Sequence, residues 1–197
     1  MIVLVMALVA EVKPVRNFLH MLRKPEHKAF PWYEEKDLVL IQSGPGKSAA
    51  ATAATYAAEQ LPIVTGFVNF GICGHGYLDI GTLLQVQKIV DQSSGRYWDL
   101  VLSPRLPIET TRLLTVESAQ QEYPENSAVD MEAAGFYDAA RRFVEPRQIA
   151  CLKVVSDNPT QHWKNINKKI MTELITNHLN SLQKVLAQIR SSCEHSG

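Results

Sequence analysis

Val129-Asp130-Met131-Glu132-Ala133-Ala134 joins a short apolar segment to an Ala-rich one. Residues 127–131 are expected to form a strand and residues 133–143 a helix. Glu132 stands at the junction, where the helix dipole favours a carboxylate in the first turn. Open α/β folds bind ligands beyond the carboxyl ends of their strands. The stretch therefore predicts an α/β fold with an acidic site at Glu132.

Two further carboxylates occupy similar positions. Glu11 follows the apolar run 2–9, and Asp157 follows the apolar run 149–155. A lone carboxylate at such a junction is more often a cap or a turn former than a catalyst. Three acids at three strand ends, in contrast, predict one site that handles hydroxyl groups and a proton.

Strand and helix patterns alternate along the chain, which predicts a three-layer α/β/α sandwich with a central mixed sheet. At this length we expect a single domain over residues 1–197. The polar segment 91–107 is expected to be a loop. The other expected strands are 2–9, 29–33, 38–42, 64–70, 83–90, 113–116 and 149–155, and the other expected helices are 12–22, 48–60 and 163–189.

Composition excludes several classes of protein. Lys plus Arg and Asp plus Glu number 20 each, so there is no electrostatic case for binding nucleic acid or an anionic membrane. The apolar N-terminus lacks a basic region and a cleavage site, and we expect a buried strand there rather than a signal peptide. No other apolar run approaches membrane-spanning length. The odd number of cysteines, three, without metal-ligand spacing, fits a reduced cytoplasm.

Two Gly-rich segments resemble nucleotide-binding motifs but have the wrong spacing. Residues 43–48, SGPGKS, would need a Gly at position 41 to form a P-loop, and that residue is Ile41. A backbone cradle for an oxyanion or hydroxyl and a tight turn for helix packing both remain open. Residues 71–76, GICGHG, fail as a dinucleotide fingerprint, although Gly74 would let the backbone approach a ligand closely. Cys73 and His75 lack a second Cys/His pair, so no metal site is expected.

Five segments match the motifs of one family in the expected order. They are 6–12 (MALVAEV), 43–47 (SGPGK), 69–74 (NFGICG), 129–133 (VDMEA) and 155–157 (VSD). On these segments the chain resembles the purine/uridine nucleoside phosphorylase superfamily, and most of all its 5′-methylthioadenosine/S-adenosylhomocysteine nucleosidases. Compared with that family the chain is shortened between about residues 91 and 113.

The resemblance implies a role for each matching position. Asp157 would protonate N7 of a leaving purine, and Glu11 would position and activate the attacking water. Glu132 would accept hydrogen bonds from the ribose hydroxyls, with Met131 packed on the sugar. Neither a metal nor an organic cofactor is needed. The residues assigned to substrate binding are Glu132, Met131, Ser156 and Gly74.

These roles imply a nucleosidase that hydrolyses a purine-type nucleoside to free base and sugar. The resemblance also implies a homodimer or higher homo-oligomer, because relatives complete the site or its lid at subunit interfaces. The base and the 5′ substituent stay open, because the family's stacking aromatic is replaced by Ser118-Ala119-Gln120. A carboxylate at Glu11 would repel phosphate, which favours hydrolysis over phosphorolysis. One alternative is a phosphorylase with its anion site at Arg16, Lys47 or Arg96. The other is a non-catalytic nucleoside-binding module.

Overall fold

The computed structural model describes residues 1–197 except 103–105, 120–122, 125 and 195–197. At its centre lies β1 (Ile2–Met6), whose five residues are all buried, as expected for the apolar N-terminus. This strand pairs in parallel with β4 (Leu38–Gln42) on one side and β5 (Gly66–His75) on the other. Beyond β4 the sheet continues through antiparallel β3 (Trp32–Glu35) and β2 (Leu22–Arg23).

On the other side of β5 the strands close into a ring. β5 pairs in parallel with β10 (Ile149–Asp157) and antiparallel with β9 (Ser127–Asp130). β6 (Leu83–Asp91) joins β10, β8 (Glu109–Thr115) joins β6, and β9 joins β8. In this ring Gly74 is the register partner of both Asp157 and Val129, so it lies between the two acid-bearing segments.

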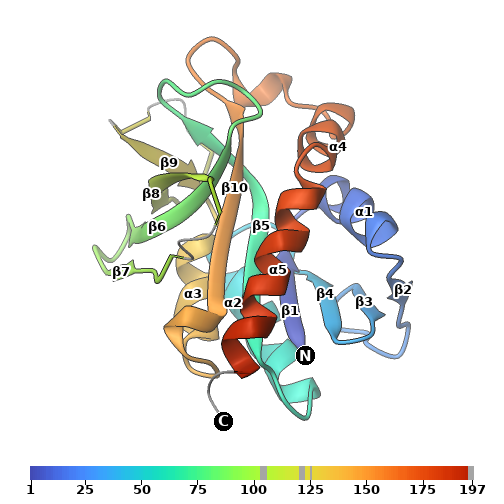
Figure 1. The fold of residues 1–197 in the computed structure, drawn as a ribbon. Helices are drawn as coiled ribbons and strands as arrows, with labels where there is room; N and C mark the ends of the chain where they lie inside the picture. The colour runs from blue at the N-terminus through green and yellow to red at the C-terminus, as the bar shows by residue number, and fades with distance from the viewer. Residues whose placement is uncertain (103–105, 120–122, 125, 195–197) are drawn as a thin grey trace.

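Helices cover both faces of the sheet (Figure 1). On one face α2 (Lys47–Gln60) and α3 (Ala133–Ala140) bury their alanines in one apolar cluster. On the other face α1 (Val9–Phe18), α4 (Lys168–Thr176) and α5 (Leu179–Glu194) pack in a second cluster. The α/β/α sandwich with a mixed sheet is therefore confirmed. Within the described residues no helix combines the length and the apolar character needed to cross a membrane.

The predicted helix over 163–189 is wrong, because the segment is divided into three parts. A short 3₁₀ turn, η2 (Trp163–Asn165), precedes α4, and α4 begins where Asn167 Oδ1 accepts from the N–H groups of Lys169 and Ile170. Between α4 and α5, His178 Nε2 lies 2.7 Å from the carbonyl oxygen of Gly81. Periodicity did not reveal the break, because the apolar stripe continues across it in the same buried cluster.

The sheet extends beyond the expected strands in two places. β5 continues through the Gly-rich segment to His75, because β10 and β9 pair with it there. Within the expected loop 91–107, β7 (Tyr97–Asp99) pairs antiparallel with β6. A second 3₁₀ turn, η1 (Pro146–Gln148), leads into β10. Pairing with β10 and β9 thus extends β5 five residues beyond the end predicted at residue 70.

Candidate active site

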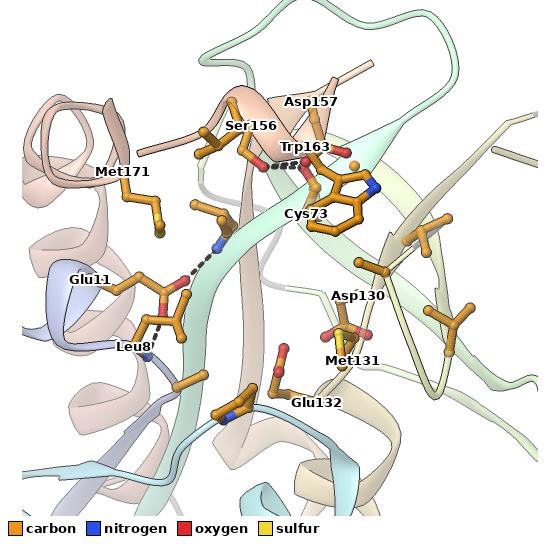
Figure 2. Close-up of a pocket in the computed structure, with 18 of the residues that line it drawn as sticks. Leu8, Glu11, Cys73, Asp130, Met131, Glu132, Ser156, Asp157, Trp163 and Met171 are labelled. Atoms are coloured by element: carbon orange, nitrogen blue, oxygen red, sulfur yellow. Dashed lines mark hydrogen bonds between the residues drawn. The ribbon is translucent and has the colours of Figure 1, made fainter. Parts of the chain in front are cut away.

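A pocket of about 270 Å³ lies beyond the carboxyl ends of β1, β5 and β10 (Figure 2). This is close to the lower end of the size range of small-molecule sites, roughly 300 Å³. All the site residues predicted from the sequence line this one pocket, although they come from distant parts of the chain. They are Glu11, Gly74, Met131, Glu132, Ser156 and Asp157.

Glu11 lies in the first turn of α1 and is only 2% exposed. Its Oε2 accepts from the N–H of Leu8 at 2.8 Å, and its Oε1 accepts from the N–H of Ile72 at 2.9 Å. Gly71 makes room for it, since a Cβ there would lie 2.9 Å from Oε1. Burial raises the pKa of Glu11 to about 7, although both backbone hydrogen bonds act in the opposite direction. A carboxyl group with this pKa is suited to take a proton from water near neutral pH.

Glu132 lies between β9 and α3 and faces Asp157 across the pocket (Figure 2). Its Oε1 accepts from the N–H of Gly46 at 2.9 Å. The Gly-rich turn before α2 thus directs a backbone donor at a carboxylate of the protein itself. Burial, followed by the nearby charge of Asp130, raises the pKa of Glu132. Its position allows it to accept hydrogen bonds from a bound ligand.

Asp157 is the last residue of β10 and is 8% exposed. Ser156 Oγ donates to its Oδ1 at 2.6 Å, and Tyr123 Oη donates to its Oδ2 at 2.5 Å. Unlike Glu11, Asp157 is held by side-chain hydroxyls. Ser156 is also close to the backbone of β5, with Oγ 3.1 Å from the carbonyl oxygen of Cys73.

A buried ion pair next to the pocket was not foreseen. Lys153 on β10 is 1% exposed, and its Nζ lies 2.8 Å from Asp130 Oδ2. Asp130 also accepts from Thr115 Oγ1 at 2.7 Å and from the N–H of Ala133 at 2.8 Å, which caps α3. Burial alone would lower the pKa of Lys153, but the charge of Asp130 and its neighbours outweighs it and raises that pKa. A lysine inside the apolar run 149–155 was the clue in the sequence.

Among the described residues, two aromatic side chains line the pocket, Tyr123 and Trp163. The sequence had predicted no stacking aromatic in the segment Ser118-Ala119-Gln120. Ala119 does line the pocket, and Gln120 lies outside the described residues. The aromatic rings come instead from other positions, after β8 and after β10, and sequence order alone did not reveal that they converge.

Within the described residues no group of three or more His, Cys, Asp or Glu side chains is arranged to hold a metal ion. His75 Nδ1 accepts from the N–H groups of Tyr77 and Leu78, and burial lowers the pKa of His75. Cys73 and Cys151 are buried and free, and burial raises the pKa of both thiols.

The chain has a nucleoside phosphorylase-like fold. A closed ring of strands lies beside the parallel strands β4, β1 and β5, helices cover both faces, and the pocket lies at the strand ends. The chain is similar to the solved structure of the 5′-methylthioadenosine nucleosidase of Arabidopsis thaliana, with a TM-score of 0.81 and 20% identity over 95% of both chains.

Two proteins of Helicobacter pylori are similar as well. One is its 5′-methylthioadenosine/S-adenosylhomocysteine nucleosidase bound to butyl-thio-DADMe-Immucillin-A, with a TM-score of 0.77 and 14% identity over 95% of this chain and 97% of that one. The other is a mutant of its futalosine hydrolase, with a TM-score of 0.75 and 13% identity over 95% and 98%. No protein-family model and no curated protein matches the chain. At these identities the similarity establishes the fold.

Proposed function

We propose that this chain is a nucleosidase, which hydrolyses the N-glycosidic bond of a purine-type nucleoside. The observation that supports it is the convergence of Glu11, Glu132 and Asp157 on one pocket (Figure 2). The similar structures include two named as nucleosidases and one named as a hydrolase of futalosine. Such a reaction requires a proton donor for the base and a group that activates water, and these acids can provide both.

The reaction builds positive charge on the sugar and negative charge on the base as the bond breaks. Asp157 gives a proton to the leaving base, which neutralises it, and such help is typically worth ~10²–10⁴-fold in rate. Glu11 takes a proton from the water whose oxygen bonds to the sugar carbon. Glu132 accepts hydrogen bonds from the sugar hydroxyls, and its negative charge favours the cationic sugar. Met131 packs beside the sugar.

Hydrolysis is favoured over phosphorolysis by the charge of the pocket. Among the described residues that line it, none is basic, and three of its four acids are buried. The three cations that a phosphorylase would need for its phosphate site do not line the pocket and have other partners. Lys47 pairs with Asp91 and Glu117, Arg96 pairs with Asp138, and Arg16 lies over the ring of Tyr33.

The test is to measure base release from purine and pyrimidine nucleosides, with and without a 5′ substituent and with and without phosphate. Phosphate-independent release that is lost in Asp157→Asn supports the proposal. Strict phosphate dependence with a sugar 1-phosphate product would assign a phosphorylase instead. Thermal stabilisation by nucleosides without any product would assign a binding module, since a ligand that binds only the folded state stabilises it.

Assembly and location remain predictions from the sequence. The buried, free state of Cys73 and Cys151 supports a reducing compartment such as the cytoplasm. Light scattering of the purified chain measures whether it forms the expected homo-oligomer.

A further inference from the structure

We propose that Tyr123 is a positioning residue for Asp157, which stabilises the carboxylate that remains once Asp157 has given its proton to the leaving base. The inference rests on the proposed function. Sequence motifs did not single out Tyr123, and its role follows from three features of the structure: its contact with Asp157, the glycine next to its ring, and the state of its proton.

The contact is a short hydrogen bond. Tyr123 Oη donates to Asp157 Oδ2 at 2.5 Å, while Ser156 Oγ donates to Oδ1 at 2.6 Å. Both oxygens of the carboxyl group are therefore fixed by hydroxyl donors from different segments. A group held at both oxygens cannot rotate freely, which aligns it with the pocket that it lines.

The ring of Tyr123 reaches Asp157 because β5 carries Gly74 next to it. A Cβ at Gly74 would overlap Tyr123 Cε1 and would lie 2.7 Å from Asp157 Oδ2. Gly74 is also the register partner of Asp157 in the sheet. The missing side chain at Gly74 thus leaves the space in which the phenol and the carboxyl group meet, and this explains a residue that the sequence had assigned only to ligand approach.

The chemistry follows from the lone pairs of Oδ2. Burial, followed by the hydrogen bond to Asp157, raises the pKa of Tyr123, so the phenol keeps its proton and acts as a donor. A carboxyl oxygen has two lone-pair sites, so Oδ2 can accept from Tyr123 at one while it carries the transferable proton at the other. As that proton moves to the base, negative charge grows on Oδ2. The hydrogen bond from Tyr123 then strengthens, because charge-assisted bonds are roughly twice as strong as neutral ones.

Tyr123→Phe tests the inference, because it removes the hydroxyl and keeps the ring. We expect kcat to fall by roughly 10-fold or more, as for the loss of a hydrogen bond to a charged group, with little change in KM. The decrease of kcat at high pH, the alkaline limb of the pH–rate profile, should also move to higher pH. The reason is that the ionised form of Asp157 is less stable without the hydrogen bond from Tyr123. A purely structural role would lower kcat without moving that limb. Unchanged kcat and an unchanged limb would overturn the inference.

Tyr77→Phe is the matched control. Tyr77 is 62% exposed, and its hydroxyl bonds only to Asn126 Oδ1, at 3.2 Å, among the described residues. This variant should keep both kcat and the alkaline limb. Fluorotyrosine at position 123 gives the opposite change, because its more acidic hydroxyl is a stronger donor, and the limb should then move to lower pH. A limb that does not respond to fluorination would also count against the inference.

Binding of a free purine base separates failure of the inference from failure of the proposed function. If the unaltered chain releases no base from any nucleoside, the proposed function fails. Calorimetry with adenine over a range of pH then decides the inference, because a protonated Asp157 should bind the base and an ionised one should not. The midpoint of that pH dependence should be higher in Tyr123→Phe. An unchanged midpoint, or no adenine binding by the unaltered chain, would overturn it.

Discussion

The two ends of the pocket hold their carboxyl groups in different ways. Glu11 accepts from the backbone N–H groups of Leu8 and Ile72, whereas Asp157 accepts from the hydroxyls of Ser156 and Tyr123. Backbone donors are fixed by the secondary structure, but hydroxyls can rotate and exchange partners. The Glu11 end is therefore rigid and tuned by burial, and the Asp157 end can adjust its hydrogen bonds while a proton moves.

A third acid, Asp130, sharpens the contrast. It is as buried as Glu11, yet it has a cation beside it, since Lys153 Nζ lies 2.8 Å away. Glu11 has no ion-pair partner among the described residues, and burial raises its pKa to about 7. The comparison shows what a nearby cation does to a buried acid. Asp130, with Lys153 beside it, is half of an ion pair, whereas Glu11, without such a partner among the described residues, can exchange a proton near neutral pH.

The largest expected effect is at the Asp157 end. Asp157→Asn keeps the shape and removes the transferable proton, so base release should fall by ~10²–10⁴-fold. Asp79→Asn is the matched control, because Asp79 is exposed. Steady-state rates at neutral pH measure both. Retention of more than about a tenth of the rate by Asp157→Asn would show that the proton comes from elsewhere.

Removing the cation tests the Asp130 ion pair. Lys153→Met leaves a buried carboxylate without its partner, which should lower the free energy of unfolding by about 3–5 kcal/mol. Urea denaturation measures the loss, with Lys184→Met on the exposed side of α5 as the control. A loss below about 1 kcal/mol would mean that the donors Thr115 and Ala133 suffice to hold Asp130.

The pH dependence of stability tests the Glu11 end. Its pKa rises from 4.5 to about 7 on folding, so its contribution to stability is full below pH 4.5 and is lost as the pH rises through 7. That decline amounts to about 3 kcal/mol in the free energy of unfolding. Glu11→Gln should remove it, while exposed Glu59→Gln should not. Urea denaturation at pH 5 and at pH 8 compares the variants, and an equal decline in Glu11→Gln would refute the assignment.

The same raised pKa predicts how activity depends on pH. Glu11 must be ionised to accept a proton from water, so the rate of base release should decrease as the pH falls through about 7. A pH–rate profile of the unaltered chain measures this acidic limb. A rate that stays constant down to pH 5 would remove Glu11 from the role of base.

The smallest expected effect concerns the aromatic side chain Trp163. If it stacks on the base at the Asp157 end, Trp163→Ala should weaken binding of the base by about 1–3 kcal/mol, and Trp163→Phe should retain most of the affinity. Calorimetry with the free base measures both variants. Equal losses for Ala and Phe would indicate that the indole N–H rather than stacking matters.

The sequence alone determined the fold class and the acids of the site. Apolar runs identified β1, β4 and β10, Ala-rich segments identified α2 and α3, and the order of Glu11, Glu132 and Asp157 at strand ends predicted their convergence. These features are local, because an apolar run or a junction carries its own evidence.

Only the tertiary structure decided which residues complete the pocket. Tyr123 and Trp163 follow different strands and line the same pocket only because β9 and β10 both pair with β5. The extension of β5 through its glycines, the break before α5 and the pairing of Lys153 with Asp130 likewise depend on neighbours far away in the chain. Side chains that act together across a sheet leave no periodic trace in the sequence, since their spacing is set by strand pairing rather than by residue number.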